Sequence, residues 1–261
     1  MVHSAFPGSA VVRCPRCDLT YLFPVRSPEE LRDAYEGPYF QAYRQAGRSL
    51  PCEHEEVPVR VRVRLQRAHA GRTPGRLLEI GVGHGSFLNY ARQEGWDVCG
   101  LDVSAYVVQT ARERFGLEVL HGTLRDVQLA SDSFDVVHLS HVVEHLPDPL
   151  EALHEVRRVL KPDGVLLVEV PNEFRNLHVR LRELAGVPLA PYPVSSTHLY
   201  FFSPRTLTAV LEKSGYRVVL LRTLRDTDDA VWTRSMLKRV AHVAERVTEM
   251  GPLIESLAVK V

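Results

Sequence analysis

The chain of 261 residues is poor in cysteine, lacks long apolar runs and has no excess of charge of either sign. Its 4 cysteines are too few to cross-link a protein of this size, which excludes a disulfide scaffold. No run approaches the roughly 18 consecutive apolar residues of a transmembrane helix, and the first residues do not have the pattern of a signal peptide. We therefore expect a cytoplasmic protein without an integral membrane segment.

The charges of the chain balance. Lysine and arginine total 32, as do aspartate and glutamate. A protein without net charge has no long-range field that attracts nucleic acid or an anionic membrane surface. With 45% hydrophobic and 25% charged residues, the composition is that of an ordinary globular protein. We expect no nucleic-acid partner.

From residue 74 onward, short apolar runs alternate with helical patterns. The runs include RLLEIGV, WDVCGLDV, SFDVVHLS and GVLLVEV. Apolar runs without strict alternation, separated by helices, are typical of a parallel sheet that is covered on both faces. Asp148-Pro149 and Ser203-Pro204 predict the starts of two helices. Two more strands are expected at 216–224 and 252–261, so the pattern predicts a doubly wound α/β fold.

Three segments fall outside this alternation. Residues 1–73 precede it, and we treat residues 74–261 as one domain with insertions at 172–202 and 225–250. Within the second insertion, apolar residues at helical spacing predict a helix with one apolar face: Met236, Val240, Val243 and Val247.

A glycine-rich loop follows the first expected strand of that domain, in the stretch LLEIGVGHGSF at 77–87. Glycine lets a backbone come close to a ligand, so this density of glycines indicates a binding loop. A dinucleotide fingerprint would place its third glycine where Ser86 stands, and a P-loop would continue with Lys-Ser or Lys-Thr. Neither pattern is present. Glu79 precedes the loop, and Asp102 follows Gly81 by 21 residues, at the end of the next strand.

Four motifs in order carry a specific resemblance: EIGVGHG at 79–85, GLDVS at 100–104, SFDVVHLSHVVEHLPDP at 133–149 and LKPDGVLLVEVPN at 160–172. Together they resemble the class I S-adenosylmethionine-dependent methyltransferases, and most closely the ubiquinone-biosynthesis and type 11, 12 and 23 groups. The resemblance implies a Rossmann-like, mostly parallel seven-stranded sheet with a C-terminal antiparallel hairpin. It also implies S-adenosylmethionine as the cofactor and a small-molecule methyl acceptor, methylated on oxygen or carbon.

The resemblance assigns roles around the cofactor. The loop glycines approach its amino-acid tail, Glu79 helps to orient the ammonium of that tail, and Asp102 accepts hydrogen bonds from both ribose hydroxyls. The residue after Asp102 packs on the adenine, and the segment at Thr123 meets the adenine from the other side, without the acid that many relatives have there. Ser140 and His141 form a ledge beneath the tail. The candidate cofactor residues are therefore Glu79, Gly81, Gly83, Gly85, Asp102, Val103, Thr123, Leu124, Ser140 and His141.

Two histidines are candidate catalytic residues, because an oxygen or carbon nucleophile usually needs a base and histidine titrates near neutral pH. His198 lies at the end of the first insertion, which we expect to pass over the carboxyl edge of the sheet, where ligands bind in such folds. His145 lies in a Glu-His pair that the resemblance places close to the cofactor. It could instead anchor its own loop through Pro147. We favour His198 as the substrate-side base.

The N-terminal segment contains RCPRC, in which Cys14 and Cys17 resemble half of a zinc ribbon. Structural zinc needs four ligands, and the relatives that carry the ribbon usually have a second Cys-x-x-Cys pair upstream. Cys52 and His54 could complete such a site only through a long-range contact. We therefore expect no metal.

The rest of that segment resembles a lid over the cofactor. Residues 27–30 form a capping box, and Tyr35, Tyr39 and Tyr43 follow at a spacing of four. The alternative is an aromatic stripe in an ordinary core. At 58–72, valines alternate with arginines as in a strand, yet relatives place a helix there, and we expect a helix.

Alternatives to a small-molecule methyltransferase stay open at this point. The first is a protein that keeps the fold and binds the cofactor or a partner without catalysis. The second is an oxidoreductase of the same architecture, which Ser86 disfavours. The third is a methyltransferase whose lipid-like substrate lies in a membrane, reached through the insertions. The sequence does not predict the oligomeric state.

Overall fold

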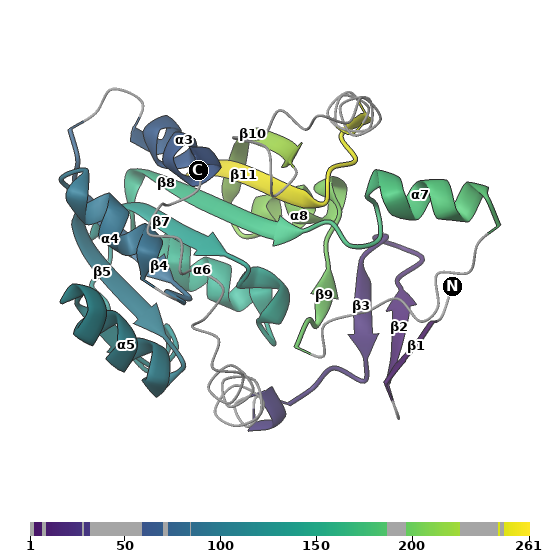
Figure 1. Cartoon of the computed structure of the whole chain (residues 1–261), viewed down its shortest axis with the longest axis horizontal. Coiled ribbons are helices and arrows are strands. Elements are labelled where there is room, and N and C mark those ends of the chain that lie inside the picture. Colours follow the sequence, from purple (N-terminus) through teal and green to yellow (C-terminus); the bar gives the residue numbers. More distant parts are fainter. Residues whose placement is uncertain are drawn as a thin grey trace.

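The computed structural model describes residues 3–6, 9–27, 29–31, 59–69, 73–83, 85–186, 197–224, 245 and 248–261. These residues form two sheets: a large one that makes the body of the protein and a small one beside it (Figure 1). The large sheet positions the candidate site, and the small sheet contacts the site from one side.

The large sheet has seven strands: β4 (Arg76–Ile80), β5 (Asp97–Asp102), β6 (Val119–His121), β7 (Phe134–Ser140), β8 (Leu160–Pro171), β10 (Tyr216–Leu224) and β11 (Leu253–Lys260). Their order across the sheet is β10-β11-β8-β7-β4-β5-β6. The strands from β6 to β8 pair in parallel, whereas β11 pairs antiparallel with both β8 and β10. This confirms the doubly wound, mostly parallel sheet with a C-terminal antiparallel hairpin.

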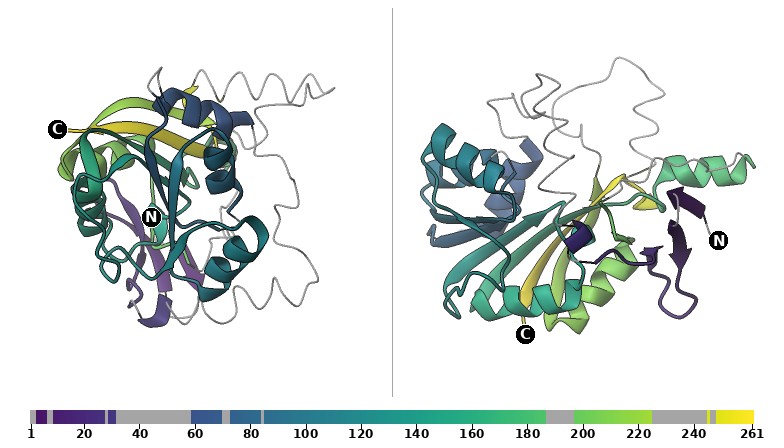
Figure 2. Two further views of the ribbon diagram at one scale, coloured as in Figure 1. Left: turned by 90° about the vertical axis from the view of Figure 1, so that its left-hand side faces the viewer. Right: turned by 90° about the horizontal axis from the view of Figure 1, so that it is seen from below.

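Helices cover both faces of this sheet (Figure 2). They are α3 (Val59–His69), α4 (Ser86–Gln93) and α5 (Ala105–Phe115) on one face, and α6 (Pro149–Val159) and α8 (Pro204–Lys213) on the other. Neighbouring residues of β4 therefore enter different cores: Leu77 packs with the first group of helices and Leu78 with the second. Burial on both faces explains why the strands are apolar throughout. The helix expected at 58–72 is confirmed by α3.

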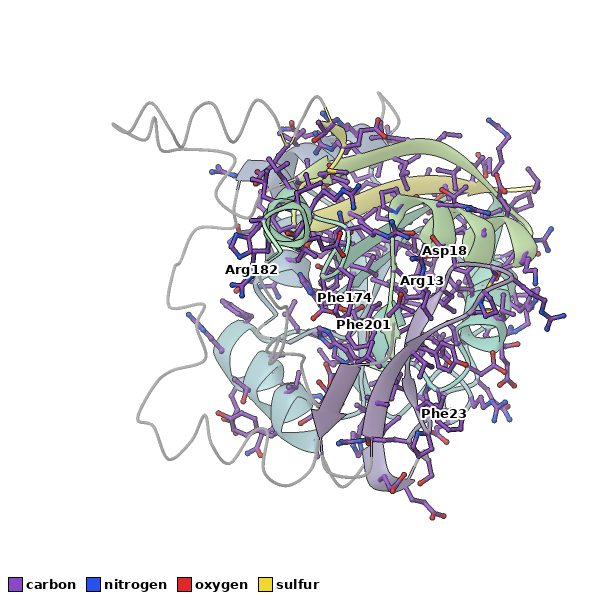
Figure 3. The ribbon with its side chains drawn as sticks, turned by 90° about the vertical axis from the view of Figure 1, so that its right-hand side faces the viewer. Arg13, Asp18, Phe23, Phe174, Arg182 and Phe201 are labelled. Atoms are coloured by element: carbon purple, nitrogen blue, oxygen red, sulfur yellow. The ribbon has the colours of Figure 1, made fainter. Side chains whose placement is uncertain are left out.

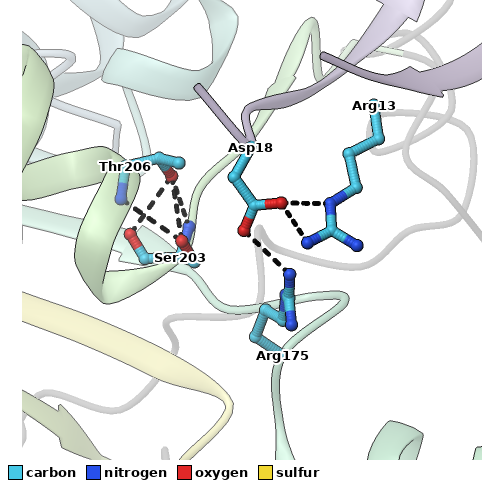
Figure 4. Close-up of polar contacts among 5 residues, drawn as sticks. All are labelled: Arg13, Asp18, Arg175, Ser203 and Thr206. Atoms are coloured by element: carbon cyan, nitrogen blue, oxygen red, sulfur yellow. Dashed lines mark hydrogen bonds and ion pairs between the residues drawn. The ribbon is translucent and has the colours of Figure 1, made fainter. Parts of the chain in front are cut away.

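The predicted capping residues begin their helices. Ahead of α6, Asp148 accepts a backbone N–H at 3.0 Å. Ahead of α8, Ser203 and Thr206 form a reciprocal capping box (Figure 4). The box at 27–30 is also present: the backbone N–H of Glu30 donates to Ser27 Oγ at 3.2 Å, and that of Ser27 donates to Glu30 Oε2 at 2.7 Å.

The small sheet joins the N-terminal segment to the first insertion. Its strands are β1 (His3–Phe6), β2 (Ser9–Arg13), β3 (Thr20–Phe23) and β9 (Tyr200–Phe201), each antiparallel to the next. Val11, Leu22 and Phe201 form its core, and the ring of Phe174 lies edge-on to Phe201 with 5.0 Å between centroids (Figure 3). These strands were not predicted from the sequence. The insertion also contains α7 (Leu177–Leu184), which extends away from the body (Figure 1).

The turn between β2 and β3 carries Cys14 and Cys17. Neither forms a disulfide, and backbone N–H groups of the turn, that of Cys17 first, lower the pKa of Cys14. Asp18 in the same turn pairs with Arg13 and, at 2.9 Å, with Arg175 (Figure 4). The second ion pair connects the turn to the segment that follows β8.

Several predictions lie outside the described residues. They concern the aromatic lid, the additional metal ligands and the helix of the second insertion: Tyr35, Tyr39, Tyr43, Cys52, His54, Met236, Val240, Val243 and Val247. Within the described ranges, no helix is long and apolar enough to cross a membrane.

Candidate active site

The glycine loop leaves β4 in a left-handed backbone conformation. The φ angles are +75° at Gly81, +54° at Gly83 and +74° at Gly85, a region that side chains rarely adopt. A Cβ on Gly81 would lie 2.4 Å from the Val142 side chain, so packing excludes one there. A Cβ on Gly83 would meet no atom of the described part of the chain within 4 Å. The loop therefore faces open space at Gly83, which fits a ligand that comes close to the backbone.

Asp102 ends β5 directly beneath this loop. One carboxylate oxygen accepts the backbone N–H of Ser104 at 2.9 Å, and the other accepts that of Gly83 at 3.3 Å. Burial raises the pKa of Asp102, while these N–H groups oppose the shift. A buried carboxylate at the open loop fits the hydroxyls of a ribose, because such acceptors form strong charge-assisted hydrogen bonds.

Glu79 lies in β4 and is buried beside a histidine that the sequence analysis did not single out. His138 Nδ1 lies 3.1 Å from Glu79 Oε1, and the His138 ring lies 3.9 Å from the ring of Phe87 between centroids. Glu79 on β4 and His138 on β7 are direct register partners. His138 therefore fixes the orientation of the carboxylate that we expect to face the cofactor.

The residues expected around the adenine follow β5 and β6. Val103 is 41% exposed, which is high for a large apolar side chain, and its carbonyl oxygen contacts His121 Nε2 at 3.0 Å. Leu124 packs partly buried against the core. The backbone N–H and the hydroxyl of Thr123 both donate to Asp126 Oδ2, at 2.8 and 2.7 Å. Asp126, three residues further along the chain, thus places a carboxylate beside Thr123.

At the end of β7, Ser140 and His141 contact another buried acid, Glu169. The hydroxyl of Ser140 donates to Glu169 Oε1 at 3.0 Å. On the ring of His141, Nδ1 lies 3.5 Å from Glu144 Oε1 and Nε2 lies 3.6 Å from Glu169 Oε1. His141 has a φ of +55°, an unusual conformation for a residue with a side chain, and such strain is common at functional sites.

The two candidate catalytic histidines lie against each other. His145 ends the short helix η1 (Val143–His145) and His198 precedes β9, with ring centroids 4.6 Å apart. His145 Nδ1 lies 2.9 Å from the carbonyl oxygen of Thr197, and His198 Nδ1 lies 3.1 Å from Glu173 Oε1. Burial lowers the pKa of His145 below its ordinary value, against the effect of the neighbouring Glu144.

Glu144 lies among these rings and is only 1% exposed. Burial alone would raise its pKa, but the neighbouring rings of His141, His145 and His198 hold the pKa below the ordinary value. The backbone of Glu144 also accepts the N–H of Leu199 at 2.8 Å, which ties the insertion to the end of β7. Glu144, Glu169 and Glu173 are site residues that the sequence analysis missed.

All the candidate residues gather at one edge of the large sheet. The glycine loop follows β4, Asp102 ends β5, the segment 122–124 follows β6, and the segment 140–145 ends and follows β7. Because β4 to β7 are parallel, these are their carboxyl ends, where ligands bind in open α/β sheets. The predicted cofactor residues and His145 therefore lie at the same edge of the sheet, where the ring of His198 lies 4.6 Å from that of His145 between centroids.

Comparison with known proteins identifies the family. The family described as a methyltransferase domain matches residues 54–221, more than half of the chain. A protein of Mycolicibacterium smegmatis, named as a probable S-adenosylmethionine-dependent methyltransferase, is 33% identical over 74% of this chain and 79% of its own length. A ubiquinone biosynthesis O-methyltransferase of Cereibacter sphaeroides is 30% identical over 63% of this chain and 70% of its own length.

A solved structure has the same fold. The 1,6-didemethyltoxoflavin-N1-methyltransferase of Burkholderia thailandensis superimposes with a TM-score of 0.60 over 100% of this chain and 99% of its own, at 15% identity. The chain belongs to the class I S-adenosylmethionine-dependent methyltransferases. It is an enzyme of that family, and S-adenosylmethionine is its cofactor.

Proposed function

We propose that the protein methylates an oxygen or carbon atom of a small-molecule acceptor. The observation that carries this proposal is the single sheet edge that joins Asp102 and the glycine loop to His145 and His198. The relative from Cereibacter sphaeroides is an O-methyltransferase, which supports oxygen as the acceptor atom. As proposed domains, residues 1–73 form an N-terminal segment, and residues 74–261 form the methyltransferase domain with insertions at 172–202 and 225–250.

The proposed cofactor residues divide by the part of the cofactor that they hold. Asp102 accepts the ribose hydroxyls, and Glu79, oriented by His138, faces the ammonium group. Val103 lies on the adenine, with the segment at Thr123 and Leu124 on the other side. The loop glycines, Gly81, Gly83 and Gly85, with Ser140 and His141, line the methionine tail.

The proposed catalytic residues act on the acceptor. The cofactor supplies a methyl group on a sulfonium; the acceptor atom bonds to that carbon while the sulfur–carbon bond breaks and its electron pair stays on sulfur. For a hydroxyl acceptor the proton must also leave. His198 and His145 either take this proton or stabilise the anion that its loss produces.

Calorimetric titration with S-adenosylhomocysteine tests the cofactor half of this proposal. We expect binding, with NAD as a negative control. Asp102→Ala should lose about 2 to 4 kcal/mol of binding free energy if two charge-assisted hydrogen bonds disappear, which is roughly 30- to 900-fold in Kd. Asp97→Ala is the matched control, because Asp97 lies at the opposite, exposed end of the same strand. A loss under about threefold at Asp102 would remove its proposed role.

A further inference from the structure

Three potential metal ligands meet on the acceptor side of the site. Glu144, His145 and His198 each offer one ligand atom, and these atoms lie within 4.8 Å of one another. We propose that Glu144, His145 and His198 bind a divalent transition-metal ion, which holds the oxygen of the methyl acceptor. The binding site stands on its own geometry, and the role toward the acceptor rests on the proposed function. The expectation from the sequence that no metal binds concerned a zinc ribbon at Cys14 and Cys17. Neither cysteine belongs to the site proposed here.

The carboxylate of Glu144 gives the first argument. Its two oxygens are buried and have no hydrogen-bond partner among the described residues. Side-chain nitrogens of His141 and His145 lie 3.5 and 3.8 Å from Glu144 Oε1, beyond a normal hydrogen bond or at its limit. A buried carboxylate without hydrogen bonds is costly, so buried charges are normally paired or bound to metal. A cation between Glu144 and the two rings of His145 and His198 meets this requirement.

The hydrogen bond of His145 gives the second argument. Its Nδ1 contacts the carbonyl oxygen of Thr197, which can only accept, so Nδ1 carries a proton. In the neutral ring, Nε2 then offers a lone pair, and it faces Glu144 Oε1 at 3.8 Å. Two acceptors that face each other repel, and a cation between them removes this repulsion. A metal-bound histidine typically donates its other N–H to a carbonyl or carboxylate, as His145 does here.

His198 repeats this pattern. Its Nδ1 lies 3.1 Å from Glu173 Oε1, so the acid orients the ring and the remaining nitrogen, Nε2, is the ligand atom. A carboxylate behind a histidine is the usual support of a metal-bound imidazole. Glu173 follows β8, whereas His198 precedes β9, so two segments of the insertion fix this ligand.

The donor set indicates the kind of ion and its use. Two imidazoles and one carboxylate suit Zn²⁺ and neighbouring divalent metals. Ligands bound at about 2.1 Å in a tetrahedron lie about 3.4 Å apart, so small side-chain rotations close the present separations. Three protein ligands leave a position for the acceptor. A hydroxyl bound there has a lowered pKa and releases its proton to solvent before the new oxygen–methyl bond forms.

Metal binding is measured in a Cys14→Ser, Cys17→Ser background, so that any zinc held by these thiols is not counted. We expect ZnCl₂ titration to give one ion per chain, and Co²⁺ to give the visible absorption of a low-coordinate site. His198→Ala should abolish this binding. Glu173→Gln should weaken it by about 10- to 100-fold, because only the orientation of His198 changes. His154→Ala, at an exposed histidine on α6, is the matched control and should bind as the background does.

Unchanged zinc affinity in both His198→Ala and Glu173→Gln would overturn the proposal, as would no zinc binding by the background protein. Glu144→Gln adds a test at the carboxylate; where this variant does not fold, the two other variants still decide. S-adenosylhomocysteine binding is measured in the same samples. Retained cofactor binding without zinc binding rejects the metal site alone, whereas loss of cofactor binding in the background protein rejects the proposed function.

Discussion

At the scale of single residues, Gly83 is the point where the loop meets open space. Gly83 and Gly116 share a left-handed conformation, with φ of +54° and +62°, and neither would crowd a Cβ. Alanine at either position should cost about 1 to 2 kcal/mol of stability through backbone strain. Only Gly83→Ala places a methyl group in the cofactor space, because Gly116 ends α5. The variants should therefore have similar thermal stability and differ in S-adenosylhomocysteine affinity. Equal affinities would contradict the assignment of the loop.

Asp102 makes cofactor binding depend on pH in a defined direction. Burial raises its pKa in the folded protein, opposed by the N–H groups of Ser104 and Gly83 and by His121 on β6. As pH falls through this raised pKa, the carboxylate gains a proton and can no longer accept two hydroxyl hydrogen bonds. We expect S-adenosylhomocysteine affinity to fall at a higher pH than for an ordinary aspartate.

The raised pKa of Asp102 also makes the stability of the fold depend on pH. Because the folded-state pKa is above the unfolded one, the ionised carboxyl destabilises the fold at pH above the folded pKa. This penalty shrinks as pH falls below the folded pKa and is gone below the unfolded pKa. Calorimetric titration across the acidic range measures the affinity for S-adenosylhomocysteine. In Asp102→Asn this affinity should no longer depend on pH. His121→Gln removes the neighbouring imidazole and leaves Asp102 in place. A pH dependence that persists in Asp102→Asn would assign it to another group.

At the scale of elements, Leu22 on β3 is the most buried of the three residues that form the core of the small sheet. Leu22 is fully buried, whereas Phe23, the next residue, is 58% exposed on the other side of the strand. Leu22→Ala should cost about 2 to 5 kcal/mol locally. Hydrogen exchange should then lose protection at 9–23 and 199–201 and keep it in β4 and β7. Phe23→Ala is the control and should leave both unchanged. Equal loss in both sheets would show that they open as one unit.

The elements also divide into those that the sequence predicts and those that it does not. The strands and helices of the large sheet were predictable, because unbroken apolar runs and capping residues are local signals. The strand β9 has two residues, and its pairing with β3 spans most of the chain, so no local pattern reveals it. The site residues divide in the same way into those that a local pattern reveals and those that only the fold brings together. Asp102 and the glycines stand in a motif, whereas the pairs Glu79–His138 and Ser140–Glu169 arise from strand register.

At the scale of the whole molecule, residues 253–261 are part of the large sheet, whereas residues 1–25 contribute strands only to the small one. The last strand, β11, lies between β8 and β10. Deleting residues 253–261 exposes the edges of both neighbours and removes part of the core. Deleting residues 1–25 leaves every strand of the large sheet in place. We expect only the second variant to unfold cooperatively on heating and to bind S-adenosylhomocysteine. Loss of cooperative unfolding in both would mean that the large sheet needs the small one.

The pairing of β3 with β9 also has a consequence for synthesis. A ribosome makes about 5 to 20 residues per second, and about 180 residues separate these two strands. The hairpin of β2 and β3 therefore emerges roughly 10 to 40 seconds before its partner strand exists. During that interval β3 has an open edge, and the thiols of the turn are exposed to the surroundings of the nascent chain. Strand β3 is thus made long before the strand that completes its pairing.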